Sequence, residues 1–590
     1  MCATPASGRD AATPDDVNAR ARQAAEKLDG QLHAAAAKLT GGLSPLAMAL
    51  AWTDWALHLA TQPAQASRLA ATAQQGALQW WGATLGQSPA PTSDGRFSAA
   101  EWQAWPWASL AHAQRATEAW WQDATALRGM SAHHQEMAGF YARQTLESLS
   151  PSNAGLLNPE VAARTRESGG ANLAKGWALA LDNWRQEHGL APLRPAAGTA
   201  YTPGVNVAVT PGRVVHRNHL AELIQYAPQT ATVQAEPIFI VPSWIMKYYI
   251  LDLSPENSLV KWLVGQGHTV FILSWRNPDE SDALLGMADY LEQGIFDPLA
   301  AIARLVPGQA VHACGYCLGG TLLGIGAAAL ARPGQVANAK QLPELASVSL
   351  LAAEVDFKEP GEMGVLIDEE QVAQLEDLMA ERGFLSGGQM GGSFAFLHSR
   401  DLVWAQRQRS LWMGEPNQPN DLMAWNADAT RMPAVMHSEY LRRCYLHNEI
   451  AESRFPVEGR PVSISDIRQP MFVVGTEKDH VSPWPSVYKI HQLTSAEITF
   501  VLTSGGHNAG IVSEPGHPRR HHALQTRAAN GPWVDPEAWR RSATRVEGSW
   551  WTAWHAWLVA HGKSRKLKAK PLTQGLCDAP GSYVHICYRD

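Results

Sequence analysis

Charged residues are scarce in this sequence. Only 17% of its 590 residues are Asp, Glu, Lys or Arg, against about 25% in an average globular protein. The net charge of −7 excludes the clustered basic excess that nucleic-acid binding requires, and we interpret the short basic run at 563–570 as a solvated segment. With 45% hydrophobic residues, the chain also does not have the composition of a disordered protein.

Cysteine and long apolar runs are rare as well. Six scattered cysteines are too few for a disulfide framework and are typical of a reducing compartment. The longest apolar stretch, at 322–331, is shorter than the roughly 20 residues that cross a membrane, and the first 16 residues lack a signal-peptide pattern. The sequence therefore predicts a cytoplasmic protein with no transmembrane segment.

Tryptophan, in contrast, is abundant. There are 24 tryptophans, and eleven of them fall in the first 200 residues, including the pairs Trp80-Trp81 and Trp120-Trp121. Two interpretations are open for these side chains. They either pack between helices or form an aromatic surface that contacts an apolar partner.

The same N-terminal part shows helical spacing of its apolar residues. This spacing occurs at 16–39, 111–149 and 172–184, whereas strand patterns are nearly absent. We therefore expect an all-α N-terminal domain over residues 1–200, which ends in a Pro- and Gly-rich linker at 192–204.

The pattern of apolar residues changes after the linker, where short apolar runs alternate with helical segments. We expect strands at 237–241, 268–273, 310–314, 348–351, 471–474 and 498–502. This alternation predicts an α/β domain over residues 201–590 with a mostly parallel sheet that helices cover on both faces. Ser254-Pro255 is expected to start the helix after the first strand. The stretch at 357–468 has no strand alternation, which is typical of an inserted cap or lid.

The strongest local motif is Gly-Tyr-Cys-Leu-Gly-Gly at 315–320. It joins a predicted strand to an apolar helix at 318–331, as in the G-x-nucleophile-x-G elbow, with Cys317 in place of serine. The helix N-terminus favours a thiolate and an oxyanion, and we expect the N–H groups of Leu318 and Ile245 to form the oxyanion hole. Three alternatives stay open for Cys317: a redox pair with Cys314, a zinc site that lacks two further ligands, and an inert buried thiol.

An elbow nucleophile requires an acid and then a histidine further along the chain. Asp479 and His507 follow two predicted strands and thus lie where open α/β sheets place their sites. Asp356 is the main rival acid, and His480 is a neighbouring histidine. A thiol that attacks a thioester keeps the acyl group activated, so a cysteine favours acyl transfer, with His507 as base and Asp479 as its support.

Several stretches together make the chain similar to a known family. They lie at 94–102, 167–172, 241–253, 265–279, 315–320, 420–430 and 548–551. In these motifs the chain resembles the class I polyhydroxyalkanoate synthases, the polyester polymerases of bacterial storage granules. The resemblance implies an α/β-hydrolase core with a mobile cap, a helical N-terminal domain and a homodimer. It also implies Cys317, His507 and Asp479 as catalytic residues, and no cofactor or metal.

The resemblance implies a reaction as well. The donors would be (R)-3-hydroxyacyl-CoA thioesters with short acyl groups, such as 3-hydroxybutyryl-CoA, and the product a polyester that forms cytoplasmic granules, where granule-associated proteins are possible partners. A polyester depolymerase or thioesterase that uses the same triad is the alternative, and a granule-coating protein with a degenerate site is a third. Asp279 also matches a family motif, without an assigned role.

The chain departs from the family pattern at a few positions. Ser243 to Met246, Glu439 and Asn508 differ from the usual residues. The first departure bears on the second oxyanion donor and the acyl pocket, and the other two bear on acyl preference, dimer contacts or the reaction itself. The segment at 516–522 differs too, and Arg519 or Arg520 is a hypothetical contact for the phosphates of CoA.

Overall fold

The computed structural model describes residues 14–40, 42–86, 90, 93–155, 157–188, 190, 201–334, 336–337, 339–416, 420–563 and 565–588. Cys2, the N-terminal segment without a signal pattern, most of the expected linker and Ser564 of the basic run lie outside these residues. In the part of the chain that is described, no helix has the length and apolar character needed to span a bilayer.

The N-terminal part is helical, as predicted. Its helices are α1 (Pro14–Leu39), α2 (Pro45–Ala60), α3 (Pro63–Thr84), α4 (Trp107–Thr125), α5 (Ala132–Ser148), α6 (Pro159–Glu167) and α7 (Ala171–Glu187). The expected run at 111–149 is two helices rather than one, because Ser131 caps the start of α5 by accepting a hydrogen bond from the N–H of His134 at 3.1 Å. The division of the chain into domains at residue 200 stays a prediction.

The C-terminal part is built on a sheet of eleven strands in the order β15-β14-β13-β12-β7-β6-β4-β5-β2-β1-β17. Its strands are β1 (Gly212–Arg217), β2 (Ala221–Tyr226), β4 (Ile238–Val241), β5 (Val270–Trp275), β6 (Val311–Tyr316), β7 (Leu345–Leu351), β12 (Met471–Thr476), β13 (Ile498–Thr503), β14 (His521–Arg527), β15 (Thr544–Glu547) and β17 (Cys577–Asp578). The six strands expected from the sequence are β4, β5, β6, β7, β12 and β13. They lie side by side and are all parallel.

The five strands that the sequence did not reveal flank this parallel core. They run antiparallel to their neighbours. β15 is exposed along its whole length and β14 is only partly buried, so neither carries the continuous apolar run that marks a strand buried on both faces. Outside this sheet, β3 (Thr232–Gln234) and β16 (Lys566–Lys568) form a separate antiparallel pair.

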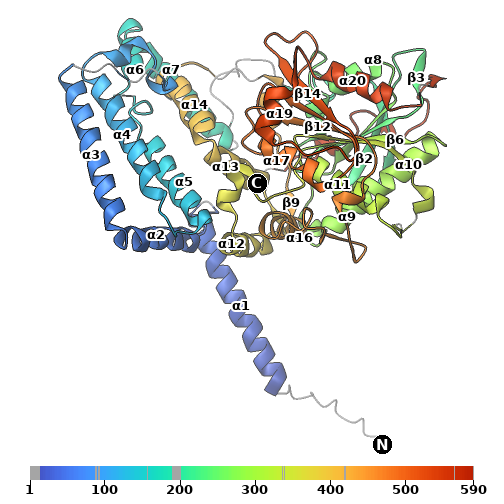
Figure 1. Cartoon of the computed structure of the whole chain (residues 1–590), viewed down its shortest axis with the longest axis horizontal. Coiled ribbons are helices and arrows are strands. Elements are labelled where there is room, and N and C mark those ends of the chain that lie inside the picture. The colour runs from blue at the N-terminus through green and yellow to red at the C-terminus, as the bar shows by residue number, and fades with distance from the viewer. Residues whose placement is uncertain are drawn as a thin grey trace, which may run out of the picture.

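Helices cover both faces of the sheet (Figure 1). On one face, α8 (Leu259–Gly265) and α20 (Trp551–Ala560) meet through Trp262 and Trp551, whose ring centroids are 5.8 Å apart. The other face carries α9 (Met287–Leu291), α10 (Asp297–Leu305) and α11 (Leu318–Ala331). The shorter helices α17 (Trp484–Tyr488), α18 (Ile490–Leu493) and α19 (Pro536–Ser542) follow the later strands.

One expected helix start is wrong. α8 begins at Leu259, and its N-cap is Ser258, whose hydroxyl accepts a hydrogen bond from the N–H of Lys261 at 3.0 Å. Ser254 does not serve as a cap because its hydroxyl donates to the carboxylate of Asp421. The contact to Asp421, which lies more than 160 residues away in sequence, could not be read from local pattern.

The segment between β7 and β12 consists mainly of helices and loops and has no strand longer than two residues, in agreement with its lack of strand alternation. It contains α12 (Glu369–Ala380), α13 (Gly387–Leu397), α14 (Ala405–Arg407), α15 (Asp421–Asn426), α16 (Ala434–Tyr440) and the two-residue strands β8 (Phe384–Leu385), β9 (Met432–Pro433), β10 (Pro456–Val457) and β11 (Arg460–Pro461). Three π-helical turns, Ser399–Trp404, Gln408–Trp412 and Leu441–Leu446, interrupt these helices.

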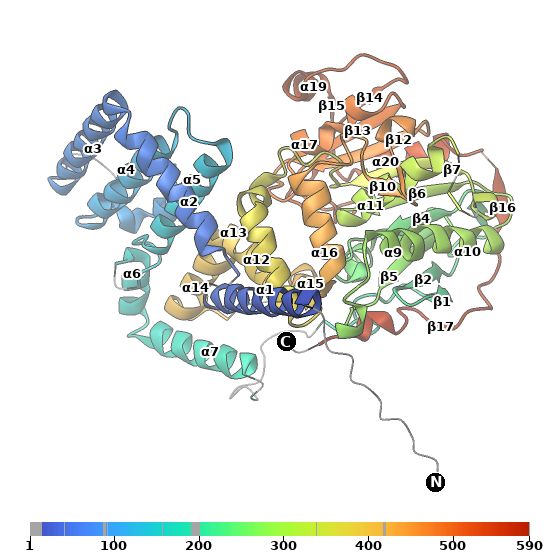
Figure 2. The same cartoon turned by 90° about the horizontal axis from the view of Figure 1, so that it is seen from below.

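This insertion lies between the N-terminal helices and the sheet in both views (Figures 1 and 2). It contacts the N-terminal helices closely. Arg400 forms a salt bridge of 2.8 Å with Asp94, His33 lies 2.9 Å from Asp377, and the amide of Asn172 donates to the carbonyl of Trp412 at 2.8 Å. The insertion therefore joins the two parts of the chain as well as covering the sheet edge.

The two tryptophan pairs differ in burial, and contact of either pair with an apolar partner stays a prediction. Trp121 packs in the helical part, with ring centroids 5.8 and 5.7 Å from those of Trp52 and Trp55, and the indole of Trp120 donates to the carbonyl of Leu69. Trp80 and Trp81 are 40% and 56% exposed on α3. One pair therefore belongs to the helix packing and the other forms part of the surface.

Candidate active site

Cys317 occupies a sharp turn between β6 and α11. Its φ of 52° and ψ of −127° lie in a region that L-residues adopt only under strain, at a cost of about 1–3 kcal/mol. A Cβ on Gly319 would lie 2.2 Å from the carbonyl oxygen of Val241, and one on Gly315 would lie 2.4 Å from the Cα of Gly320. The glycines of the motif are thus required by the close approach of backbone at this elbow.

Asp479 lies on the loop that follows β12, and His507 lies on the loop that follows the neighbouring parallel strand β13. Nδ1 of His507 is 2.9 Å from Oδ2 of Asp479. The carboxylate also accepts hydrogen bonds from the hydroxyl of Thr476 at 2.8 Å and from the N–H groups of Val481 and Ser482 at 2.9 and 2.8 Å. These bonds fix the carboxylate so that it faces the imidazole.

Electrostatics couples the three side chains. Burial would raise the pKa of Asp479, but the charge of His507 and the hydrogen bonds outweigh it and lower that pKa below its ordinary value. Burial would likewise lower the pKa of His507. The charges of Asp479 and Cys317 and hydrogen bonds to both outweigh this effect and raise the pKa of His507 well above its ordinary value. The structure thus brings together Cys317, His507 and Asp479, while their catalytic roles stay a prediction.

The rival residues lie in other environments. The carboxylate of Asp356 accepts from the N–H of Lys358 at 2.9 Å and from the amide of Asn448 at 3.1 Å. The ring of His480 faces His398, with centroids 5.4 Å apart. Cys314 is buried within β6, where desolvation raises the pKa of its thiol. These positions favour Asp479 over Asp356.

The structure gives no support to the metal or disulfide alternatives. The five cysteines that it describes are free thiols. Within the described part of the chain, no group of three or more His, Cys, Asp or Glu side chains is arranged to hold a metal ion.

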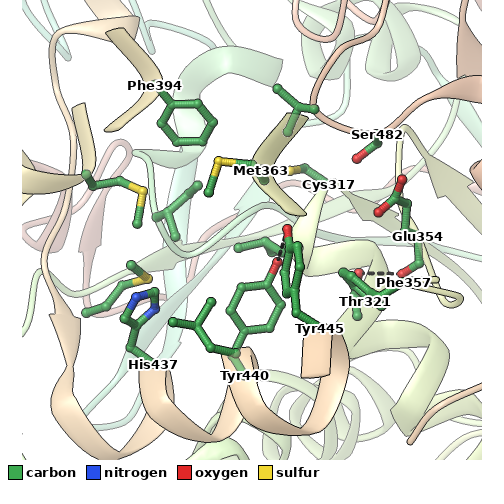
Figure 3. Close-up of a pocket in the computed structure, with 16 residues that line it drawn as sticks. Cys317, Thr321, Glu354, Phe357, Met363, Phe394, His437, Tyr440, Tyr445 and Ser482 are labelled. Carbon is green, nitrogen blue, oxygen red and sulfur yellow. Dashed lines mark hydrogen bonds between the residues drawn. The ribbon is translucent and has the colours of Figure 1, made fainter. Parts of the chain in front are cut away.

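Cys317 lines a mostly apolar pocket under the insertion (Figure 3). Leu318 and Ile245, the two expected oxyanion-hole residues, line the same pocket. The insertion contributes Met363, Met390, Phe394, Met432, His437, Tyr440, Leu441 and Tyr445. The insertion thus supplies most of the apolar side chains around the thiol, while its role as a cap stays a prediction.

Glu354 is one of several polar pocket residues that the sequence reasoning did not single out. Glu354 follows β7, lines the pocket with Cys317 and is buried. It lies at the same sheet edge as Asp356, only two residues before it, so the rule that placed Asp356 near the site applies equally to Glu354. A buried glutamate in an apolar stretch was the available signal.

Asp279 and Arg520, two further residues named from the sequence, interact with other groups of the protein. Asp279 accepts from the N–H and hydroxyl of Ser281 and pairs with Arg276 at 2.6 Å. The guanidinium of Arg520 is directed at the carbonyls of Ser504 and Val512, whereas Arg519 is exposed.

Asn508 and Glu439, two residues that differ from the family pattern, each accept a hydrogen bond. Oδ1 of Asn508 accepts a hydrogen bond from the phenol of Tyr316 at 2.7 Å. Oε2 of Glu439 accepts from the N–H of Met287 at 2.7 Å, at the start of α9. Both side chains are therefore built into the packing around the pocket.

A nucleophile elbow after a central parallel strand, with an acid and a histidine after later strands, defines an α/β-hydrolase fold, here with a cysteine at the elbow. Residues 93–263 match the family model "Poly-beta-hydroxybutyrate polymerase (PhaC) N-terminus", and residues 23–65 match "Poly-beta-hydroxybutyrate polymerase N terminal". A relative in the same family is 38% identical over 84% of this chain, so the chain belongs to the poly(3-hydroxyalkanoate) polymerase family.

Individual relatives extend this match over most of the chain. A poly(3-hydroxyalkanoate) polymerase of Methylorubrum extorquens is 38% identical over 502 residues, which are 84% of this chain and 81% of the relative. A poly(3-hydroxyalkanoate) polymerase subunit of Cupriavidus necator is 36% identical over 458 residues, 75% of each chain. Among solved structures, a monoacylglycerol lipase of Paleococcus ferrophilus aligns with 58% of this chain and all of its own, at 14% identity and a TM-score of 0.32.

Proposed function

We propose that this chain polymerises (R)-3-hydroxyacyl groups, which it takes from CoA thioesters and holds on Cys317. Family membership supports this reaction over the depolymerase or thioesterase alternative, because the relatives are named polymerases. The observation that carries the mechanism is the coupled set of Cys317, His507 and Asp479 at the elbow.

The first step loads the enzyme. His507 accepts the proton of the Cys317 thiol, and the thiolate attacks the carbonyl carbon of the acyl-CoA. The N–H groups of Leu318 and Ile245 are proposed to hold the oxyanion that forms. When the bond between carbon and the CoA sulfur breaks, the CoA thiolate takes the proton from His507, and Asp479 orients the imidazole throughout.

The second step extends the polyester. The 3-hydroxyl of an incoming acyl-CoA loses its proton to His507 and attacks the acyl chain on Cys317. A new ester bond forms, the bond to the Cys317 sulfur breaks, and the thiolate is restored. The extended chain, now a CoA thioester, returns to Cys317 by repeating the loading step, which releases free CoA.

Cysteine suits this cycle because one thioester is exchanged for another of nearly equal energy, so the acyl group stays reactive. The apolar pocket excludes the water that would hydrolyse the loaded enzyme. The pocket is lined by bulky side chains such as Met390, Phe394 and Tyr440, which supports a short acyl group. Because these side chains belong to the insertion, we propose that the insertion moves to admit the growing chain.

The assembly around this activity is part of the same proposal. The family resemblance implies a homodimer at the surface of a polyester granule. Trp80 and Trp81, exposed on α3, supply amphipathic aromatic side chains of the kind that suit a boundary between water and an apolar phase.

The deciding experiment is to supply 3-hydroxybutyryl-CoA to the purified chain. We expect release of free CoA, measured with a thiol reagent, together with recovery of polyester. The Cys317→Ala variant is the matched control, and it should fold normally but release no CoA. Release of CoA with only free 3-hydroxybutyrate as product would overturn the polymerase proposal.

A further inference from the structure

Glu354 is a buried carboxyl group that faces the pocket without a partner for one of its oxygens. Its exposed fraction is 3%, and among the residues that the structure describes, its Oε1 has no hydrogen-bond partner. The backbone holds the residue in place, because its carbonyl accepts from the hydroxyl of Thr321 on α11 at 2.7 Å (Figure 3). An unpaired polar atom at this depth destabilises the fold unless a ligand satisfies it.

The pocket has other polar groups besides Glu354, namely those of Thr321, Ser482, His437, Tyr440 and Tyr445. The hydroxyl of Thr321 is used by Glu354 itself, and the phenol of Tyr440 donates to that of Tyr445 at 3.3 Å. Nδ1 of His437 is also unpaired, but burial alone accounts for the low pKa of about 4 of His437. In Figure 3, Glu354 and His437 lie on opposite sides of the pocket.

Glu354, in contrast, is coupled electrostatically to the reacting groups. Burial raises its pKa well above the ordinary value. The charges of Asp479 and Cys317 raise the pKa further, and those of His507 and Lys489 only partly oppose them. These influences favour the neutral carboxylic acid, a form that offers one hydrogen-bond donor and one strong acceptor at the same place.

A hydroxyl group also carries one donor and acceptor lone pairs, so it is complementary to a carboxylic acid. The proposed substrate carries such a hydroxyl two carbons from the carbonyl carbon that Cys317 attacks. We propose that Glu354 binds the 3-hydroxyl of the acyl group and thereby selects hydroxylated over plain acyl donors. This inference rests on the proposed function and identifies the feature of the substrate that the pocket recognises.

Selection by such a contact is strong because the analogue without the hydroxyl leaves a buried polar atom unpaired. The test compares 3-hydroxybutyryl-CoA with butyryl-CoA, which has the same chain length and no hydroxyl. Both donors can load Cys317, so single-turnover release of CoA measures acylation separately from polymerisation. We expect the wild-type chain to load the hydroxylated donor at least about 10-fold faster. Equal loading rates would overturn the inference without any variant.

Variants of Glu354 locate the effect. Glu354→Leu, which keeps the apolar volume but no polar group, should lower the ratio of the two loading rates about 10-fold or more. Glu354→Gln retains a donor and an acceptor and should keep the ratio within about 3-fold of wild type. Glu354→Met replaces the leucine variant if the latter does not fold.

Phe394→Leu is the matched control, because it changes the same pocket without touching a polar group. It should change the loading rates of both donors by the same factor. If Glu354→Leu also lowers both rates equally, its role is structural and the inference is wrong. If the wild-type chain releases no CoA from 3-hydroxybutyryl-CoA, the proposed function itself fails, so the two failures are distinguishable.

Discussion

The phenol of Tyr316 donates a hydrogen bond of 2.7 Å to Oδ1 of Asn508. Tyr316 immediately precedes Cys317, and Asn508 immediately follows His507. The bond therefore connects the loop that carries the proposed base to the last residue of β6, which directly precedes the nucleophile. The ring of Tyr316 also lies beside that of His507, with centroids 5.8 Å apart. Asn508, which looked like an unexplained departure from the family, has a defined structural partner here.

We expect Asn508→Leu to lower the rate of CoA release about 3- to 10-fold, because it leaves the buried Tyr316 hydroxyl unpaired and loosens the His507 loop. Tyr316→Phe should have a similar effect. The double variant should be no worse than either single variant, since both polar partners are then removed. Initial rates of CoA release measure this, and additive losses would contradict the coupling.

Asp479→Asn is expected to lower the rate about 10³- to 10⁴-fold, as in other triads whose acid is neutralised, because His507 loses the group that orients it. Asp356→Asn is the matched control and should cost less than about 10-fold, since Asp356 contacts Lys358 and Asn448 rather than the imidazole. The rates of CoA release rank the two variants. The reverse ranking would mean that Asp356 is the acid.

The Asp479–His507 pair should make stability depend on pH. Asp479 has a lowered folded-state pKa, so its contribution is present above its ordinary value of 3.8 and is lost as the pH falls through the folded-state pKa. His507 has a raised folded-state pKa, so its contribution is present below its ordinary value of 6.5 and is lost as the pH rises through the folded-state pKa.

The difference in Tm between wild type and Asp479→Asn should therefore be largest between these two ordinary values and shrink at both extremes. Thermal unfolding at a series of pH values measures it. A difference that stays constant with pH would contradict the charged pair.

Glu439→Ala should lower the free energy of unfolding by about 1 kcal/mol, because the N–H of Met287 at the start of α9 loses its acceptor. Glu439→Gln, which keeps an acceptor oxygen, is the control and should be less destabilised. Denaturant unfolding measures both. We expect neither variant to change the preference between acyl donors, and a change in that preference would assign Glu439 to the pocket instead.

Trp80→Ser with Trp81→Ser should weaken binding of the chain to polyester particles and leave CoA release unchanged, because both side chains are exposed far from the elbow. The control is Trp121→Ser, which removes the contacts with Trp52 and Trp55 and should lower Tm instead. Co-sedimentation with the particles measures binding. Unchanged binding of the double variant would leave the exposed pair without a role at the granule.

The sequence was most informative where burial is most complete. The parallel strands β4 and β12 begin as continuous apolar runs because both of their faces are covered, and α11 begins and ends where its motif and apolar run predicted. β14 and β15 at the sheet edge mix polar and apolar residues, so no local pattern distinguishes them from loops. Their strand conformation depends on pairing with β13 and with each other.

The site shows the same limit. Cys317, Asp479 and His507 could be selected because each follows a recognisable strand, and the topology then places their loops together. Glu439 could not be selected in this way, and for Glu354 the same rule gives the sheet edge but not the contacts of its side chain. The contacts of both side chains depend on the packing of the insertion against the sheet edge, which brings together residues far apart in sequence.

The uneven burial of tryptophan gives the molecule two optical reporters. Within the described chain, five of the six exposed tryptophans, Trp80, Trp81, Trp105, Trp177 and Trp184, lie in the N-terminal helices. Trp550, Trp551 and Trp554 are enclosed beside the sheet, with exposed fractions of 0 to 1%. Iodide should therefore quench mainly the fluorescence of the helical part, while the protected, blue-shifted emission follows the sheet. A single unlabelled sample can thus report whether the two parts of the chain unfold together or in sequence.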